Sequence, residues 1–430
     1  MICNNIGVNS KNHITFSGHD VCELAKKYGT PLYIYDEQRV RENCRIYKDA
    51  MDKYFPSALP CFASKAAAFK RIYEIMKEEG MGIDVVSIGE IYTAMKAGMP
   101  LDNAYFHSNN KTDEDVAFAI ENGVGYFVVD NAEELFAIER ICEKACKRQK
   151  VLLRLTPGID THTYEAVNTG KVDSKFGSAI ETGQAEEITK LALSMNTIDL
   201  KGFHCHIGSQ VFDSDTFLRG SEIMLDFIAL IKTKYSYEAE ELSLGGGYGV
   251  KYVESDPEID IAENIKQVSE YIKSYCDKVG LNVPKLLMEP GRSIVADAGM
   301  TVYSVGTIKE IPGYKNYISV DGGMTDNIRY ALYGSEYTLF VANKAADEAN
   351  FTADVVGRCC ESDDIIQPKV TLPKPERNDI IAVCTTGAYN YSMASNYNRI
   401  CRPAVVFVSG DRDYLAVKRE TLDDLVANDI

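Results

Sequence analysis

The chain lacks several features that would assign it to other classes of protein. It has no run of about 18 or more apolar residues, so we expect no transmembrane helix. Residues 1–6 contain no basic segment followed by an apolar core, so we expect no signal peptide. Positive charge is scarce, because 46 Lys and Arg residues stand against 63 Asp and Glu residues, a formal charge of −17. This balance argues against nucleic acid or an anionic membrane as the main partner.

The twelve cysteines show neither the spacing of a disulfide framework nor a Cys-x-x-Cys pair. We therefore expect free thiols in a reducing compartment and a cytoplasmic protein. A length of 430 residues exceeds one ordinary single-core domain, so we expect two domains or a large barrel with an accessory domain.

Eight short runs of β-branched and aromatic residues alternate with longer amphipathic stretches. The runs span residues 60–64, 83–87, 104–107, 126–129, 151–155, 200–206, 242–244 and 285–288. The helix-like stretches include residues 65–79, 112–122, 131–148, 215–235 and 261–278, and the pairs Thr112/Asp115 and Asn131/Glu134 have capping-box spacing. Eight strand–helix units predict a (β/α)8 TIM-type barrel over residues 37–300. An open doubly wound sheet is the alternative, but it normally has fewer strands and a different glycine-rich entry.

After residue 300 the pattern changes to strands without comparable helices between them. These strands are expected at residues 301–308, 316–320, 351–356, 380–384 and 404–408. We therefore predict a C-terminal β-sandwich or β-barrel domain formed by residues 1–36 and 301–430, to which the first segment adds a strand or two.

Polar, titratable or glycine-rich groups follow nearly every predicted barrel strand, and active sites of this fold collect at that end of the strands. Lys65 lies among apolar residues, where partial burial would lower its pKa and make it a nucleophile; the alternative is a snorkelling lysine at a helix start. Residues 245–249, Gly-Gly-Gly-Tyr-Gly, suit the close approach of an anion, or simply a tight turn. Glu289 opens a Glu-Pro-Gly-Arg segment that could equally be a β-turn with a salt bridge.

Two histidines end the sixth predicted strand. His204 and His206 share one face of the strand and Cys205 lies on the other, so the three cannot converge on one zinc ion, and we expect no metal site. A hydrogen-bonded core histidine is the usual role for such a residue. His206, beside Gly208 and Ser209, is the better candidate for function.

Four segments together resemble the fold-type III pyridoxal-phosphate decarboxylases: residues 62–66, 206–210, 245–247 and 289–292. Three more, at residues 321–334, 360–362 and 387–389, narrow the resemblance to the diaminopimelate decarboxylase family. It covers essentially the whole chain in the same order. Two departures are Ala67, where the family has asparagine, and Cys359 preceding Cys360.

The resemblance implies an alanine-racemase-like fold, pyridoxal 5'-phosphate as cofactor and a homodimer with shared active sites. It implies decarboxylation of meso-2,6-diaminopimelate to L-lysine and CO2, the last step of lysine biosynthesis. Lys65 would be the Schiff-base lysine, Glu289 would hold the pyridinium proton and His206 would stack on the ring. The phosphate would be bound by Ser209, Gly245, Gly246, Gly247 and Tyr389.

On the substrate side, the resemblance implies that Glu361 binds the distal amine and that Cys360 is the catalytic proton donor. Both residues would act across a dimer interface, in the site of the partner subunit. The non-reacting end would be bound by Arg292, Arg329 and Tyr333, with Tyr389 beside it. A carboxylate at position 289 favours decarboxylation over racemisation, because it keeps the ring nitrogen protonated. Two arginines favour a substrate with a second carboxylate. The alternatives are a decarboxylase of D-lysine, D-ornithine or a related amino acid, and a non-catalytic homologue.

Overall fold

The computed structural model describes residues 1–55, 57–159 and 174–430. The chain divides into two compact units. Unit 1 comprises residues 1–42, 250–257 and 292–430, and unit 2 comprises residues 43–249 and 258–291. Among the described residues, no helix has the length and apolar character that crossing a membrane requires.

Unit 2 is built around a closed barrel of eight parallel strands, which confirms the predicted barrel. Neighbouring strands pair in chain order, and β8 pairs with β9 as β13 pairs with β5, so the sheet closes on itself. The barrel strands are β5 (Leu59–Ala63), β6 (Gly82–Val85), β7 (Ala104–Phe106), β8 (Tyr126–Val129), β9 (Gln149–Thr156), β11 (Ile198–His204), β12 (Glu241–Ser243) and β13 (Lys285–Met288), and the short β10 (Ser178–Ala179) pairs with β9.

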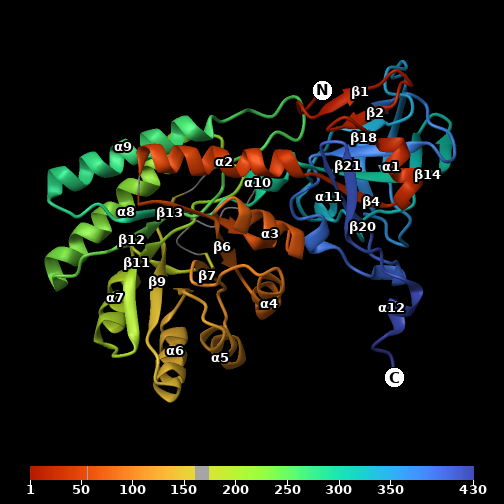
Figure 1. Cartoon of the computed structure of the whole chain (residues 1–430). Helices are drawn as coiled ribbons and strands as arrows, with labels where there is room; N and C mark the ends of the chain where they lie inside the picture. The colour runs from red at the N-terminus through yellow and green to blue at the C-terminus, as the bar shows by residue number, and fades with distance from the viewer. Residues whose placement is uncertain (56, 160–173) are drawn as a thin grey trace. The chain divides into compact units, whose positions relative to one another are not determined.

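Helices follow the barrel strands and lie outside them, as Figure 1 shows for α3 to α9. The predicted capping box of Thr112 with Asp115 is present at the start of α5. Asn131 caps α6 as expected, but the carboxylate of Glu134 instead accepts from the N–H of Asp130 and from Lys111. The helices are α3 (Lys70–Glu78), α4 (Ile88–Lys96), α5 (Asp113–Glu121), α6 (Ala132–Ala145), α7 (Gln184–Ser194), α8 (Ser214–Tyr235) and α9 (Ile261–Val279).

The end of the barrel where the strands begin is closed by a buried polar cluster. Glu241, the first residue of β12, accepts hydrogen bonds of 2.9 Å from both Tyr105 and Tyr126, whose rings stack 4.4 Å apart. Lys285 lies 3.4 Å from the same carboxylate. Paired in this way, the buried charge is tolerated. The predicted site residues of this unit lie at the opposite end, where the strands finish.

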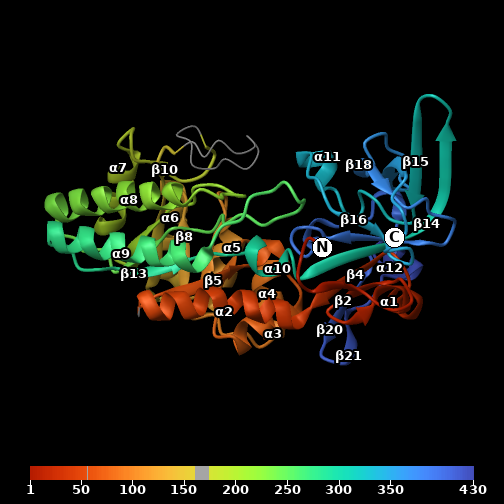
Figure 2. The same ribbon diagram turned by 90° about the horizontal axis from the view of Figure 1, so that it is seen from above.

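Unit 1 contains a three-stranded sheet and a larger mixed sheet. The first comprises β1 (Ile6–Val8), β2 (Ile14–Phe16) and β3 (His19–Asp20). The second comprises β4 (Leu32–Asp36), β14 (Gly299–Ile311), β15 (Lys315–Val320), β16 (Leu339–Val341), β17 (Phe351–Val356), β18 (Ile365–Leu372), β19 (Ile380–Cys384), β20 (Ala404–Ser409) and β21 (Arg412–Val417). Figure 2 shows β14 and β15 extending as a hairpin beyond the rest of this sheet.

The predicted strands of the β domain are all present, but the N-terminal segment contributes more than the strand or two expected. It supplies β1 to β4 and α1 (Val21–Tyr28), and β4 pairs with both β14 and β20. Three further short helices belong to this unit: α10 (Arg292–Val295), α11 (Arg329–Tyr333) and α12 (Leu422–Val426). The core between the sheets is apolar and includes Phe16, Leu32, Val302 and Val406.

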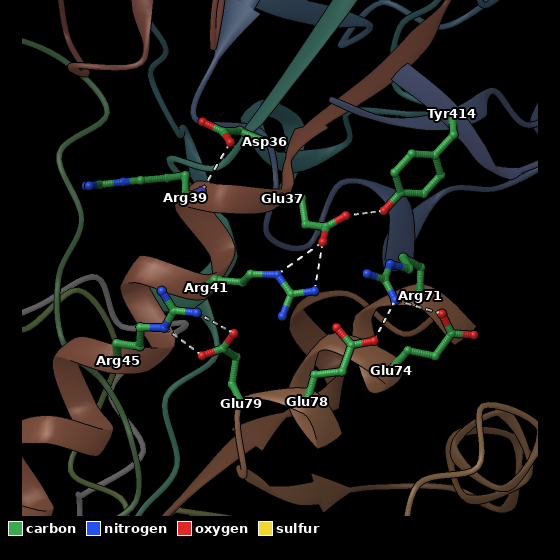
Figure 3. A network of polar contacts seen from close by, with 10 residues as sticks. All are labelled: Asp36, Glu37, Arg39, Arg41, Arg45, Arg71, Glu74, Glu78, Glu79 and Tyr414. Atoms are coloured by element: carbon green, nitrogen blue, oxygen red, sulfur yellow. Dashed lines mark hydrogen bonds and ion pairs between the residues drawn. The ribbon is translucent and has the colours of Figure 1, made fainter. Parts of the chain in front are cut away.

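Helix α2 (Glu37–Tyr54) begins in unit 1 and continues into unit 2, and each part has its own ion pairs (Figure 3). In unit 1, Glu37 binds Arg41 at 2.7 Å and accepts a hydrogen bond from Tyr414. In unit 2, Arg45 forms a two-pronged pair with Glu79 at 2.8 and 3.0 Å. Arg71 of α3 bridges Glu74 and Glu78, both at 3.0 Å (Figure 3). The Arg45–Glu79 pair therefore links α2 to the end of α3, whereas the Arg71 pairs lie within α3.

Candidate active site

The predicted site residues fall into two sets, one in each compact unit. Unit 2 holds Lys65, His206, Ser209, Gly245, Gly246, Gly247 and Glu289, all at or just after the C-terminal ends of barrel strands. Unit 1 holds Arg292, Arg329, Tyr333, Cys360, Glu361 and Tyr389. Each set is described below by itself.

Lys65 lies in a 3₁₀ turn, Ser64–Ala66, directly after β5. The expectation that this lysine is partly buried is wrong, because its side chain is exposed while Ala66 and Ala67 are fully buried. The two alanines take the inward positions of the turn and leave Lys65 at the rim of the barrel. Its positive charge acts on Asp84, Glu90 and His206, so these groups belong to the same rim.

Glu289, the residue after β13, is buried and fully engaged. Its Oε2 lies 3.0 Å from Nε2 of His204, and its Oε1 accepts a 2.8 Å hydrogen bond from Ser243. His107 lies 3.5 Å from the same Oε1. Burial raises the pKa of Glu289, but His204 and His107 lower it by more, so the pKa lies well below its ordinary value. Glu289 is therefore a carboxylate at neutral pH. Its partners are His204, Ser243 and His107, so the alternative of a simple β-turn with a salt bridge does not apply.

His204, which the sequence pattern placed only in the core, is a direct partner of Glu289. Burial lowers its pKa to about 4, against the opposing effect of Glu289, so the ring is neutral at pH 7. A neutral imidazole that donates from Nε2 keeps Nδ1 unprotonated. That Nδ1 is buried and has no hydrogen-bond partner among the described residues. The tautomer is thus set by Glu289.

His107 and Asp84 complete this buried cluster. His107 follows the third predicted strand, where polar groups of the site were expected, but Asp84 was not identified from the sequence. The Nε2 atom of His107 lies 3.7 Å from Oδ1 of Asp84, and its ring packs edge-on against His204 at 4.9 Å. Burial raises the pKa of Asp84, while His107 lowers it. The signal for these residues is their position, since each stands at the C-terminal end of a barrel strand.

The glycine loop after β12 packs too tightly for any side chain. A Cβ atom on Gly246 would lie 2.2 Å from the carbonyl oxygen of Glu289, and one on Gly247 would lie 2.4 Å from that of Gly208. Gly245 and Gly247 also have positive φ angles of 68° and 117°. The N–H of Gly246 donates to Nδ1 of His206 at 3.3 Å, so the ring proton of a neutral His206 is on Nε2. Burial holds the pKa of His206 well below its ordinary value.

In unit 1, two arginines lie against the ring of Tyr389. The guanidinium carbons of Arg292 and Arg329 are 4.9 and 5.3 Å from the ring centroid. Arg329 also lies 5.4 Å from the ring of Tyr333. Both arginines are about nine-tenths buried, with 6% of the surface exposed. Arg329 forms no ion pair with any described residue, and its buried Nε has no hydrogen-bond partner there. A buried guanidinium without a carboxylate is suited to receive one from a ligand.

Tyr252 supports this arginine pair and was not identified from the sequence. Its hydroxyl accepts a 2.8 Å hydrogen bond from Nη1 of Arg292, and its ring packs edge-on against Tyr337 at 5.5 Å. Tyr252 belongs to the short segment 250–257, which is part of unit 1 although barrel residues flank it in the sequence. Sequence position alone therefore could not place it beside Arg292.

The adjacent thiols Cys359 and Cys360 differ in their surroundings. Cys360 and Glu361 are exposed in the loop between β17 and β18, and the N–H of Cys360 donates to Oδ1 of Asn398 at 2.8 Å. Cys359 is half-buried, and burial together with the nearby charge of Asp364 raises its pKa to about 11. Cys360 is the more accessible of the two thiols.

Comparison with known proteins gives consistent matches over nearly the whole chain. The family model described as "Pyridoxal-dependent decarboxylase, pyridoxal binding domain" matches residues 37–296. The chain is 44% identical to diaminopimelate decarboxylase of Bacillus methanolicus over 413 residues, 96% of each protein. It is 42% identical to the Bacillus subtilis enzyme of the same name, over 98% of this chain and 96% of that protein.

Solved structures agree with these relatives. The crystal structure of diaminopimelate decarboxylase from M. jannaschii in complex with L-lysine superposes with a TM-score of 0.91 at 33% identity, covering 99% of this chain and 98% of that chain. Both the sequence relatives and this structure span the two units described above. The chain therefore belongs to the pyridoxal-dependent decarboxylases and, within them, to the diaminopimelate decarboxylase family.

Proposed function

We propose that the chain binds pyridoxal 5'-phosphate and decarboxylates meso-2,6-diaminopimelate to L-lysine and CO2, as the last step of lysine biosynthesis. The observation that carries the proposal is Glu289, a buried carboxylate that His204 and Ser243 hold ionised at the end of β13. A carboxylate in this place keeps a pyridine nitrogen protonated, and a protonated ring is the stronger electron sink.

The residues of unit 2 fit this cofactor. The N–H of Gly247 has no acceptor among the described residues and lies in a loop that only glycines can form, as expected for a phosphate site. Lys65 is exposed at the same rim and can carry the cofactor through its amine. We assign the phosphate to Ser209, Gly245, Gly246, Gly247 and Tyr389, and the face of the ring to His206.

When bound, pyridoxal phosphate would supply the electron sink for the electron pair that departing CO2 leaves on the α-carbon. The chain's own groups do the rest. Glu289 holds the proton on the ring nitrogen, and Cys360 supplies a proton from Sγ to the carbon that lost CO2. Arg292, Arg329 and Tyr333 bind the carboxylate at the non-reacting end, with Tyr389 beside them. Glu361 binds the distal ammonium group.

We further propose a cytoplasmic homodimer in which Cys360 and Glu361 act in the site of the partner subunit. The substrate assignment depends on the arginine pair, because a substrate without a second carboxylate would leave Arg329 buried without a counter-charge. That is the argument against D-lysine and D-ornithine as principal substrates.

A substrate panel tests the function. The purified chain, supplied with pyridoxal phosphate, is assayed for CO2 release from meso-2,6-diaminopimelate, D-lysine and D-ornithine. We expect kcat/KM for diaminopimelate to exceed kcat/KM for D-lysine and D-ornithine by at least about a hundredfold. This is the effect expected from losing one buried charge-assisted hydrogen-bonded pair. Arg329→Met should remove most of this preference, whereas Arg358→Met, at an exposed arginine of the same unit, should not. Equal turnover of D-lysine would contradict the assignment, and no CO2 from any substrate would favour a non-catalytic homologue.

A further inference from the structure

One buried carboxylate connects the two loops of unit 1 that carry Arg329 and Cys360. Asp364, at the start of β18, has only 4% of its surface exposed. Its Oδ1 accepts a 2.6 Å hydrogen bond from the N–H of Met324, and its Oδ2 accepts a 2.7 Å bond from the N–H of Cys359. Met324 stands five positions before Arg329, and Cys359 immediately precedes Cys360. Each oxygen of the carboxylate therefore serves a different loop.

Two glycines allow the loops to close around this carboxylate. A Cβ atom on Gly323 would lie 2.3 Å from Oδ1 of Asp364, and one on Gly357 would lie 2.3 Å from both oxygens. The same Cβ of Gly357 would lie 2.5 Å from Cα of Gly323, so the two backbones touch across the carboxylate. Gly323 has a φ angle of 146°, which also favours glycine. No side chain fits between these loops at either position.

Further bonds make the arrangement rigid on both sides. The N–H of Arg358 donates to the carbonyl of Gly322 at 3.0 Å, which is a direct backbone link between the two loops. The Cys360 loop is also closed on itself, since the N–H of Gly357 donates to the carbonyl of Asp364 at 2.9 Å. On the other loop, Asp326 accepts a 3.1 Å bond from the N–H of Gly323.

We infer that Asp364 is a positioning residue that holds two segments of one chain together: the loop of the proton-donating Cys360, which acts in the partner's site, and the segment before Arg329, which acts in the chain's own site. The inference rests on the proposed roles of those two residues. Asp364 accepts no hydrogen bond from Arg329 or Cys360 themselves. It acts on them through the backbone N–H groups of Met324 and Cys359, which belong to the same chain segments. A single buried group thereby links substrate binding in one site of the proposed dimer to protonation in the other.

The chemistry of the group explains why a carboxylate is needed. Both of its oxygens accept hydrogen bonds, so it can satisfy two converging backbone N–H groups. Asparagine has nearly the same shape but offers one acceptor and one donor, so one of the two N–H groups would face an N–H₂ group. Leaving a buried donor unsatisfied is costly. Asp364→Asn therefore tests the link with little change in volume.

Hydrogen–deuterium exchange of the whole protein is the direct test. In Asp364→Asn we expect the backbone amides of both loops, in peptides covering 322–328 and 357–362, to exchange about tenfold faster. The matched control is Asp363→Asn, which removes the same charge from the exposed neighbouring residue and should alter neither peptide. Should Asp364→Asn not fold, Asp364→Ser, which is smaller and keeps one acceptor oxygen, takes its place against the same control.

Steady-state kinetics separate KM from kcat, and simple destabilisation of the fold would not change the two in the way expected here. Asp364→Asn should raise KM about tenfold, the effect we also expect of Arg329→Lys, and lower kcat about tenfold, the effect we also expect of Cys360→Ser. Combined with Cys360→Ser, the Asp364→Asn change should lower kcat no further, because both act on one step.

Faster exchange in one loop only, or in neither, overturns the inference, as does a full additional loss of kcat in the double variant. If the wild-type chain releases no CO2 from diaminopimelate, the proposed function fails, and the exchange measurement alone decides the role of Asp364.

Discussion

The Nε2 atom of His204 lies 3.0 Å from Oε2 of Glu289, and both side chains are buried inside the barrel. Because the His204 ring is neutral at pH 7, the contact is a hydrogen bond from imidazole to carboxylate rather than an ion pair of full charges. With Ser243 on the other oxygen, Glu289 has one donor on each side. Donors on both oxygens thus fix the orientation of the carboxylate, and His204 and His107 lower its pKa.

Removing this donor should weaken catalysis by way of Glu289. In His204→Leu, Oε2 loses its partner, and burial then raises the pKa of Glu289. We expect kcat to fall about ten- to a hundredfold, the value of a hydrogen bond to a charged group. His204→Gln, whose amide can donate, should recover part of the loss.

The absorbance of the bound cofactor as a function of pH, alongside kcat, checks that the effect acts on the ring. His19→Leu, at a histidine on the surface of unit 1, serves as the control. Equal kcat in His204→Leu and the wild type would rule out the supporting role of His204.

Lys65 should be the lysine that becomes covalently attached to the cofactor. Exposure of its amine at the barrel rim, rather than burial, makes it accessible. Borohydride reduction of the holoprotein followed by peptide mapping should place the label on Lys65 alone. Lys70→Arg, at an exposed lysine five positions further on, should leave the label in place, whereas Lys65→Arg should abolish it. A label on any other lysine would refute the assignment.

Shared sites in a dimer should allow two inactive chains to restore activity together. Lys65→Ala and Cys360→Ala proteins are each expected to be inactive. In a mixed dimer with shared sites, one site carries both defects and the other carries neither, so random exchange should give about a quarter of wild-type activity. Differently tagged chains must first show that subunits exchange. If they exchange and the mixture stays inactive, Cys360 acts in its own subunit or not at all.

Asp326 should make the stability of unit 1 depend on pH. Burial raises the pKa of Asp326 from 3.8 to about 7, although Tyr303, Gly323 and Thr325 donate hydrogen bonds to it. Between these two values the folded chain binds more protons than the unfolded chain, so raising the pH lowers the free energy of unfolding. Asp326→Asn cannot titrate, so its stability relative to the wild type should increase from about pH 4 to pH 7. Urea unfolding across this range measures the difference, and a constant difference would contradict the expectation.

The fold was largely predictable because each barrel strand leaves a local signal. Residues 60–64 and 285–288, for example, are short apolar runs bounded by polar loops, and β5 and β13 lie there. A local pattern does not show which strands pair with one another. That β13 closes the barrel against β5 depends on contacts between residues more than two hundred positions apart. Among the first 36 residues, β1, β2 and β3 pair with one another but have only two or three residues each, too few for a periodic pattern, whereas β4 has partners far along the chain.

The candidate site was predictable where a residue type is itself informative, as for Lys65, Glu289 and the glycine loop. The exposure of Lys65 was not predictable, because the sequence around it is apolar while the turn that it forms directs the side chain outward. The sequence favoured His206, beside Gly208 and Ser209, over His204, and nothing in it indicated that His204 is the partner of Glu289. The contacts of Asp364 join segments that no periodicity relates.

The pairing of β4 with β14 and β20 bears on how the chain folds as it is synthesised. The partners of Leu32 in this sheet are Val302 and Ala404, so the sheet closes over more than two hundred and sixty intervening residues. Unit 2 ends at residue 291, so all of it is synthesised before any of β14. The barrel can therefore form first, while β4 remains without its two partner strands. During that interval β4, an apolar strand with both edges open, is the segment most in need of protection from aggregation.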